Sequence, residues 1–216
     1  MKLTNEEIER NRQEFISLIK TITVPGAQIE QLLQDLDNSD FYYAPASTQY
    51  HSAFEGGLCL HSLNVYKHLI SLTNLYGNFI PHYEQNSLLI VGLLHDLSKI
   101  NFYEPIAVNK KKYYPGGTKR DNLGTFDWYS EEGYKIKDAK DRFLGGSHEF
   151  NSMLLANKYI PLNFEETVAI SNHHFGMSDK NPTGDLSAIA NRFPLLTLLH
   201  IADIASTYLS EREVDE

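Results

Sequence analysis

The chain has 216 residues, 42% of them hydrophobic, and 28 Asp and Glu against 19 Lys and Arg give a formal net charge of −9. This length and composition predict one globular domain, residues 1–216, with a substantial core. The acidic balance argues against strong binding of double-stranded nucleic acid, which needs clustered cations. The longest apolar run, residues 88–94, is far too short to span a membrane. The single cysteine excludes an intrachain disulfide, and the polar N-terminus does not resemble a secretory signal. We therefore expect a cytoplasmic protein.

The first 40 residues predict two short helices. Thr4 and Glu7 have the spacing of a capping box, and apolar residues then recur at helical spacing until Pro25-Gly26 breaks the pattern. A second short helix is expected over residues 29–36. After an irregular stretch over residues 41–57, the periodicity predicts a long helix over residues 58–76 and another over residues 84–97.

The pattern changes at residues 102–138, which predict a small β insertion. Strands are expected over residues 108–114 and 125–129 around the turn at 115–118, with a short third strand over residues 134–136. Helices resume over residues 148–158, 164–173 and 194–210, the last one beginning at Pro194. The predicted fold class is therefore mainly α, a helical bundle with a β-hairpin insertion.

The pair His95-Asp96 ends the longest apolar run. Charged groups are rarely buried unless they are paired or bound to a metal, so this pair is a candidate ligand pair. Further blocks of metal-capable residues lie on both sides of it along the chain, at His61, His148, His173-His174 and Asp203. Imidazole and carboxylate ligands together favour a divalent transition metal such as Mn, Fe, Ni, Co or Zn.

Three motifs resemble the HD superfamily of metal-dependent phosphohydrolases: Gly-Gly-Leu-x-x-His-Ser-x-x-Val at 56–65, Leu-Leu-His-Asp-Leu-Ser-Lys at 93–99, and Leu-His-x-Ala-Asp at 199–203. The resemblance covers residues 45–210 and implies the HD-domain helical bundle. It implies a first metal held by four ligands: His61, His95, Asp96 and Asp203. Asp96 would bridge to a second metal held by His148, His173 and His174. Some relatives carry a Glu four residues before the first His for a third metal, but that position here is Gly57.

Two more residues are candidates for the site. Lys99 follows Asp96 by three residues, so on a helix both would face one side, and its cation could neutralise charge on a phosphate during catalysis. The alternative is an exposed lysine at a helix end. His200 lies three residues before Asp203 and either orients that carboxylate from outside the ligand shell or packs in the core. Asp96 and Lys99 are therefore the predicted catalytic residues.

The β insertion combines lysines and arginine with aromatic residues. Such a patch could stack a base or hold a phosphate. The alternative, which we take as the expectation, is a hairpin whose alternation buries its aromatic side chains on the bundle.

The function expected from these residues is metal-dependent hydrolysis of a phosphoester in a small anionic substrate, a nucleotide or short oligonucleotide. One alternative is a cyclic-nucleotide phosphodiesterase. The Gly-Tyr-Pro segment typical of the cyclic-di-GMP branch is absent after His174, where the chain continues Phe-Gly-Met-Ser. A second alternative is a non-catalytic, metal-stabilised regulatory or binding module, which the full set of candidate ligands disfavours.

Overall fold

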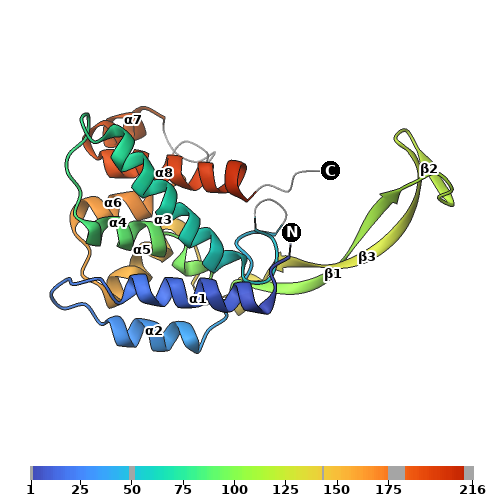
Figure 1. Ribbon diagram of the computed structural model, residues 1–216, viewed down its shortest axis with the longest axis horizontal. Coiled ribbons are helices and arrows are strands. Elements are labelled where there is room, and N and C mark those ends of the chain that lie inside the picture. The colour runs from blue at the N-terminus through green and yellow to red at the C-terminus, as the bar shows by residue number, and fades with distance from the viewer. Residues whose placement is uncertain (1, 49–51, 143, 175–182, 212–216) are drawn as a thin grey trace.

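Helices form a bundle from which a long β ribbon projects (Figure 1). The computed structural model describes residues 2–48, 52–142, 144–174 and 183–211; the side chains of residues 183–187 are not described. The α-helices are α1 (Asn5–Ile19), α2 (Ile29–Asp37), α3 (Gly57–Tyr76), α4 (Gln85–Leu94), α5 (His148–Tyr159), α6 (Phe164–Ser171), α7 (Thr183–Arg192) and α8 (Pro194–Ala205). The prediction of a mainly α fold with a small sheet is confirmed. Helix α7 was not predicted.

The N-terminal helices form as their sequence predicts. The Thr4 hydroxyl accepts from the Glu7 backbone N–H while the Glu7 carboxylate accepts from the Thr4 N–H, which completes the capping box of α1. Helix α1 buries Phe15 and Ile19, and α2 buries Leu32, all of them in the main core. These two helices thereby cover one side of the bundle and contribute no ligand to the site described below.

Close contact between α3 and α4 brings two of the candidate metal ligands together. A Cβ atom added at Gly92 of α4 would lie 2.9 Å from Cα of Tyr66 on α3, so a larger residue would force the helices apart. Because His61 lies on α3 and His95 directly follows α4, this contact sets the separation of their rings, whose Nε2 atoms are 3.4 Å apart.

Two helices end earlier than predicted, and both ends place a histidine. Helix α4 stops at Leu94 rather than at residue 97, and a 3₁₀ turn, Leu97–Lys99, follows. Helix α6 stops at Ser171 rather than at residue 173. In each case the imidazole forms a hydrogen bond with a carbonyl oxygen of its own helix, in place of a backbone N–H group. Nδ1 of His95 bonds the Gly92 oxygen at 3.0 Å, and Nδ1 of His173 bonds the Ile170 oxygen at 2.8 Å.

The predicted helix over residues 194–210 is α-helical only to Ala205 and continues as a π-helical turn, Ser206–Ser210. The Ser206 hydroxyl donates to the Ala202 oxygen, and the Glu211 N–H bonds the Ser206 oxygen five residues back. Such turns are frequent at functional sites. This one leads the chain to Glu211, which lies buried against α3.

The β insertion is an antiparallel sheet of order β1-β3-β2, formed by β1 (Tyr103–Tyr113), β2 (Lys119–Asp121) and β3 (Gly124–Ile136). The prediction of a separate third strand over residues 134–136 is wrong. Those residues form the end of β3. Tyr103, the first residue of β1, pairs with Ile136, so the two long strands extend further than predicted. The third strand is β2, in the connection between the long strands.

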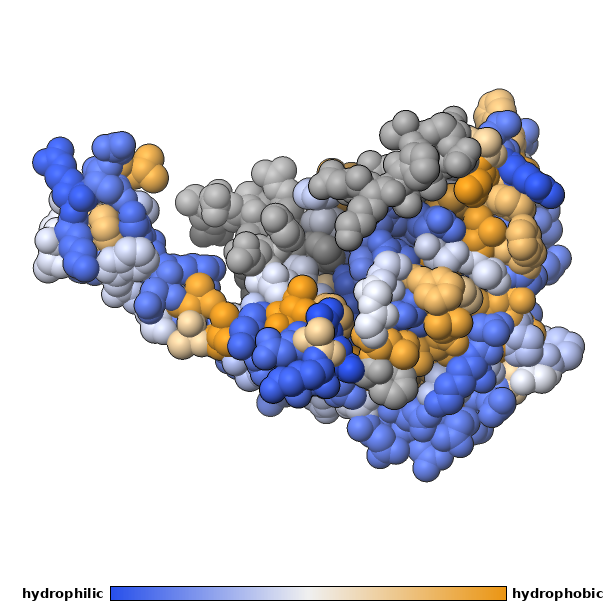
Figure 2. Space-filling model, turned by 180° about the vertical axis from the view of Figure 1, so that it is seen from behind, coloured by the Kyte–Doolittle hydropathy of each residue, from blue (hydrophilic) through white to orange (hydrophobic). Residues whose placement is uncertain are grey.

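The expectation that the hairpin buries its aromatic side chains on the bundle is also wrong for four of them. The sheet projects away from the helices, and hydrophilic residues cover most of its tip (Figure 2). Between 40% and 49% of the surface remains exposed for Tyr113, Tyr114, Trp128 and Tyr129. Phe126 is buried, but its ring neighbours, Tyr113 and Trp128, belong to the sheet itself.

Across the described residues, the helices are all too short or too polar to cross a membrane.

Candidate metal centre

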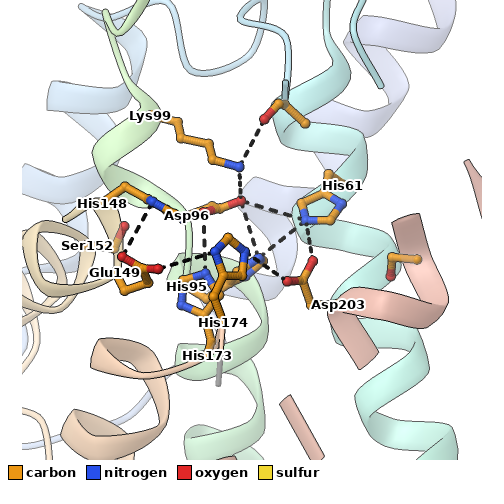
Figure 3. Close-up of polar contacts among 12 residues, drawn as sticks. His61, His95, Asp96, Lys99, His148, Glu149, Ser152, His173, His174 and Asp203 are labelled. Carbon is orange, nitrogen blue, oxygen red and sulfur yellow. Dashed lines mark hydrogen bonds and ion pairs between the residues drawn. The ribbon is translucent and has the colours of Figure 1, made fainter. Parts of the chain in front are cut away.

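Asp96 lies at the centre of the residues that the sequence predicted as ligands (Figure 3). Its Oδ2 atom is 3.7 Å from Nε2 of His61 and 3.5 Å from Nε2 of His95. Its Oδ1 atom faces the other way, 3.7 Å from Nε2 of His148 and 3.6 Å from Nε2 of His173. One carboxylate therefore stands between two groups of imidazoles, with one oxygen toward each.

Asp203, on α8, is a second carboxylate that contacts both groups of imidazoles. Its Oδ1 atom lies 3.1 Å from Nε2 of His61, and its Oδ2 atom lies 3.4 Å from Nε2 of His174. The structure thus brings all seven predicted ligands into one cluster. They arrive from α3, the end of α4, the start of α5, the turn after α6, and α8.

The donor set fits divalent metal ions. Ligands bound at about 2.0–2.1 Å lie roughly 3.0–3.5 Å from one another, close to the separations around Asp96. Three sets of ligand atoms each lie within 4.8 Å of one another: His61, His95 and Asp203; His95, Asp96 and His173; and His148, His173 and His174.

Some of these inward-facing atoms lack a hydrogen-bond partner among the described residues. They are Oδ1 of Asp96 and the Nε2 atoms of His148 and His173. Buried polar atoms without a partner cost free energy, and these three converge at 3.6–3.7 Å, beyond hydrogen-bond distance. A bound cation would satisfy all three at once.

Burial and charge set the protonation of the cluster. Burial lowers the pKa of His95 to about 3 and that of His148 to about 4, which keeps both rings neutral near pH 7 and able to ligate. Burial disfavours the charged form of Asp96, but the adjacent Lys99 cation outweighs it and holds the pKa of this carboxyl well below its usual range.

Two rings behave differently. Burial opposes protonation of His61, yet the Glu211 charge and a hydrogen bond to Asp203 raise its pKa to about 10. Burial also opposes protonation of His174, but hydrogen bonds to Asp203 and Glu149 raise its pKa to about 9. Metal binding at such rings releases the proton.

Lys99 is buried beside Asp96 and is not an exposed helix-end residue. Its Nζ atom lies 2.7 Å from Oδ2 of Asp96 and donates to the Ala46 oxygen at 2.9 Å. Only 8% of its surface is exposed. The three-residue spacing therefore does bring the cation to Asp96, although on a 3₁₀ turn rather than on an α-helix.

His200 contacts the cluster through the backbone of a predicted ligand. Its Nδ1 atom bonds the carbonyl oxygen of His173 at 2.7 Å. This contact anchors the turn after α6; the sequence had left open whether His200 orients Asp203 or packs in the core. Gly57 occupies the position where some HD-superfamily members carry a glutamate for a third metal. A Cβ atom added there would lie 2.0 Å from the Ser52 oxygen, so no side chain fits.

Two residues at the site were missed from the sequence. Glu149 lies between the rings of His148 and His174, and Glu211 lies against the ring of His61. Adjacent helix residues rarely face each other, so the position of Glu149 next to His148 carried no signal. Glu211 belongs to an acidic C-terminal stretch in which no spacing distinguishes it.

No family model, curated protein or solved structure matches this chain. The chemistry of the site therefore follows from its own geometry.

Proposed function

We propose that this chain is a metal-dependent phosphohydrolase of the HD superfamily that acts on a phosphoester in a small anionic substrate, a nucleotide or short oligonucleotide. The single observation that carries the proposal is the position of Asp96. Its two oxygens face two separate groups of imidazoles, and a buried lysine lies 2.7 Å from it. A pair of metals about 3.5–4 Å apart, bridged in this way, is the arrangement that many phosphoester hydrolases use.

The residues divide into two metal sites. The first would be held by His61, His95, Asp96 and Asp203, and the second by Asp96, His148, His173 and His174. When bound, the metals would supply Lewis-acid chemistry, polarising a phosphoryl oxygen and lowering the pKa of a water molecule.

The differences in burial suggest the side from which a substrate approaches. The side chains of His148 and His174 remain 26% and 35% exposed, while those of His61 and His95 have no exposed surface. A phosphate would therefore reach the centre over the second site.

Lys99 is proposed to act from the interior. Its ammonium group has three N–H donors, and two of them serve Asp96 and the Ala46 oxygen. The third donor and the positive charge can stabilise a phosphoryl oxygen as negative charge develops on it. The same cation holds Asp96 ionised, which a bridging ligand requires.

A panel assay tests the proposal. Purified protein is loaded separately with Mn, Fe, Ni, Co and Mg and incubated with nucleoside monophosphates and triphosphates, cyclic nucleotides, and short RNA and DNA. We expect metal-dependent release of phosphate or nucleotide from at least one class, abolished by chelator. Turnover of cyclic nucleotides alone would make the chain a phosphodiesterase. Folded, metal-loaded protein that turns over none of them would refute the proposal in favour of a binding module.

A further inference from the structure

Glu149 contacts two of the proposed ligands of the second metal site at the same time. Its Oε1 atom lies 3.2 Å from Nδ1 of His174, and its Oε2 atom lies 3.5 Å from Nδ1 of His148. The glutamate side chain is 14% exposed, so little water competes for it. His148 is the first residue of α5, where the backbone has only begun to coil, so these adjacent side chains can face each other.

Glu211 occupies the corresponding place at the first site. Its two oxygens lie 3.1 and 3.2 Å from Nδ1 of His61. The Ser52 hydroxyl and the Asn64 amide also donate to it, at 2.7 and 3.0 Å. Glu211 is 4% exposed, and its partners come from α3 and from the chain before α3.

All five histidines thus present Nε2 to the centre, and an outer oxygen lies within 3.5 Å of each Nδ1; for His148 that 3.5 Å is an ion-pair distance to Glu149. For His95 and His173 the acceptor is a backbone carbonyl, which can only accept. Where Nδ1 carries the proton, the lone pair is left on Nε2, the atom that faces Asp96 or Asp203. His148, His174 and His61 depend on a carboxylate side chain for the same arrangement.

We propose that Glu149 is the positioning residue of the second metal site, fixing the tautomer of both His148 and His174, and that Glu211 has this role for His61 in the first site. The inference rests on the proposed metal centre and extends it, because it assigns each site its own outer carboxylate. The two sites should then lose affinity separately when the carboxylates are changed.

The chemistry of an amide makes the proposal testable. A carboxylate accepts from two Nδ1–H groups, but the amide of Glu149→Gln can accept from only one and presents N–H to the other. One of the two histidines must then turn to the tautomer with the proton on Nε2, which leaves no lone pair on the atom that faces the centre. In Glu211→Gln the amide oxygen can still accept hydrogen bonds from His61 and Asn64. The amide nitrogen then faces the Ser52 hydroxyl, which can accept from it.

The experiment is metal binding by elemental analysis and by titration with Mn²⁺, on wild type, Glu149→Gln, Glu211→Gln and Glu211→Ala. Glu104→Gln removes a carboxylate that pairs with Lys135 in the sheet and is the matched control. We expect two ions in wild type, the control and Glu211→Gln. Glu149→Gln should keep the first ion and bind the second about 10- to 100-fold more weakly. Glu211→Ala should weaken the first ion by a similar factor. Far-UV circular dichroism of each variant in chelator shows whether the helices are retained.

If Glu149→Gln bound both ions with wild-type affinity, the role of Glu149 would be overturned. The same would follow if Glu149→Gln retained its helices but lost both ions equally. Wild-type affinity for both ions in Glu211→Ala would overturn the role of Glu211. Wild-type protein that binds two ions but hydrolyses nothing would refute the proposed function and leave this inference intact, since its readout is metal affinity.

Discussion

At the scale of single residues, the site depends most on Asp96, because its two oxygens are shared between two groups of imidazoles and a lysine. Asp96 is 1% exposed and Lys99 is 8% exposed. Buried charges persist when they are paired and hydrogen-bonded, and here the pairing extends to the proposed metals. Substitutions at these two positions should therefore separate metal binding from catalysis.

Asp96→Asn should abolish hydrolysis, and it should do so more completely than His148→Ala. The amide cannot carry the negative charge shared by two cations, whereas loss of His148 leaves the first site intact. Steady-state rates on the best substrate of the panel compare the two variants, and circular dichroism checks that the helices are retained. Turnover near the wild-type rate in metal-loaded Asp96→Asn would show that this carboxylate is not the bridge.

Lys99→Met should lower the turnover rate far more than it lowers metal content. Methionine keeps most of the side-chain volume but removes a charged donor of the kind worth about 2.7–4 kcal/mol, or roughly 100- to 1000-fold in rate. Lys135→Met, which removes an exposed lysine that also pairs with a glutamate, is the control. Turnover and bound metal are measured on the same preparation. Loss of metal in parallel with activity would mean that Lys99 serves only to hold Asp96.

At the scale of elements, the site depends on where helices end and how closely they approach. The order of the motifs along the sequence was enough to predict the seven candidate ligands that the structure brings together. The ends of α4 and α6 could not be predicted, because the rings of His95 and His173 form hydrogen bonds with carbonyl oxygens of their own helices and so end them. Periodicity reports which face of a helix is apolar and contains no information on such side-chain bonds.

Gly92→Ala should lower the free energy of unfolding by about 1–3 kcal/mol, the usual cost of overpacking, because the added methyl would lie 2.9 Å from Cα of Tyr66. Gly145→Ala is the matched control: a Cβ there has no neighbour within 4 Å, and we expect a change within about 0.5 kcal/mol. Urea unfolding of the two variants measures both values. Equal stability of the variants would mean that α3 and α4 are not in the close contact described here.

The tip of the sheet should be dispensable for the metal centre. Among the residues that the structure describes, its side-chain hydrogen bonds are internal, for example Lys111 and Tyr113 to Asp121. Replacing residues 111–128 by an Asn-Gly turn should therefore leave metal content and the unfolding temperature of the bundle unchanged. Elemental analysis and thermal unfolding test this. A large loss of either would show that the tip supports the bundle.

At the scale of the whole molecule, an acidic chain with net charge −9 places a cluster of five histidines and two aspartates inside a helical bundle. The sequence predicted the mainly helical fold and the residues of this cluster but neither the projection of the sheet nor the outer carboxylates. The alternation of apolar and polar residues along the hairpin is the same whether its aromatic face packs on helices or faces solvent, so it could not predict the position of the sheet. Glu149 reaches His174 and Glu211 reaches His61 through tertiary contacts, and Glu211 follows a π-helical turn.

The most direct test of the metal centre is the metal content of the wild-type chain. Protein purified without chelator and reconstituted with Mn²⁺ or Fe²⁺ is analysed for bound metal per chain, with circular dichroism to show that it is folded. The cluster predicts two ions per chain at saturation, held by imidazole and carboxylate ligands. Folded protein that retains less than about 0.2 ion per chain after reconstitution would contradict the metal centre, given the ligand preferences of such sites.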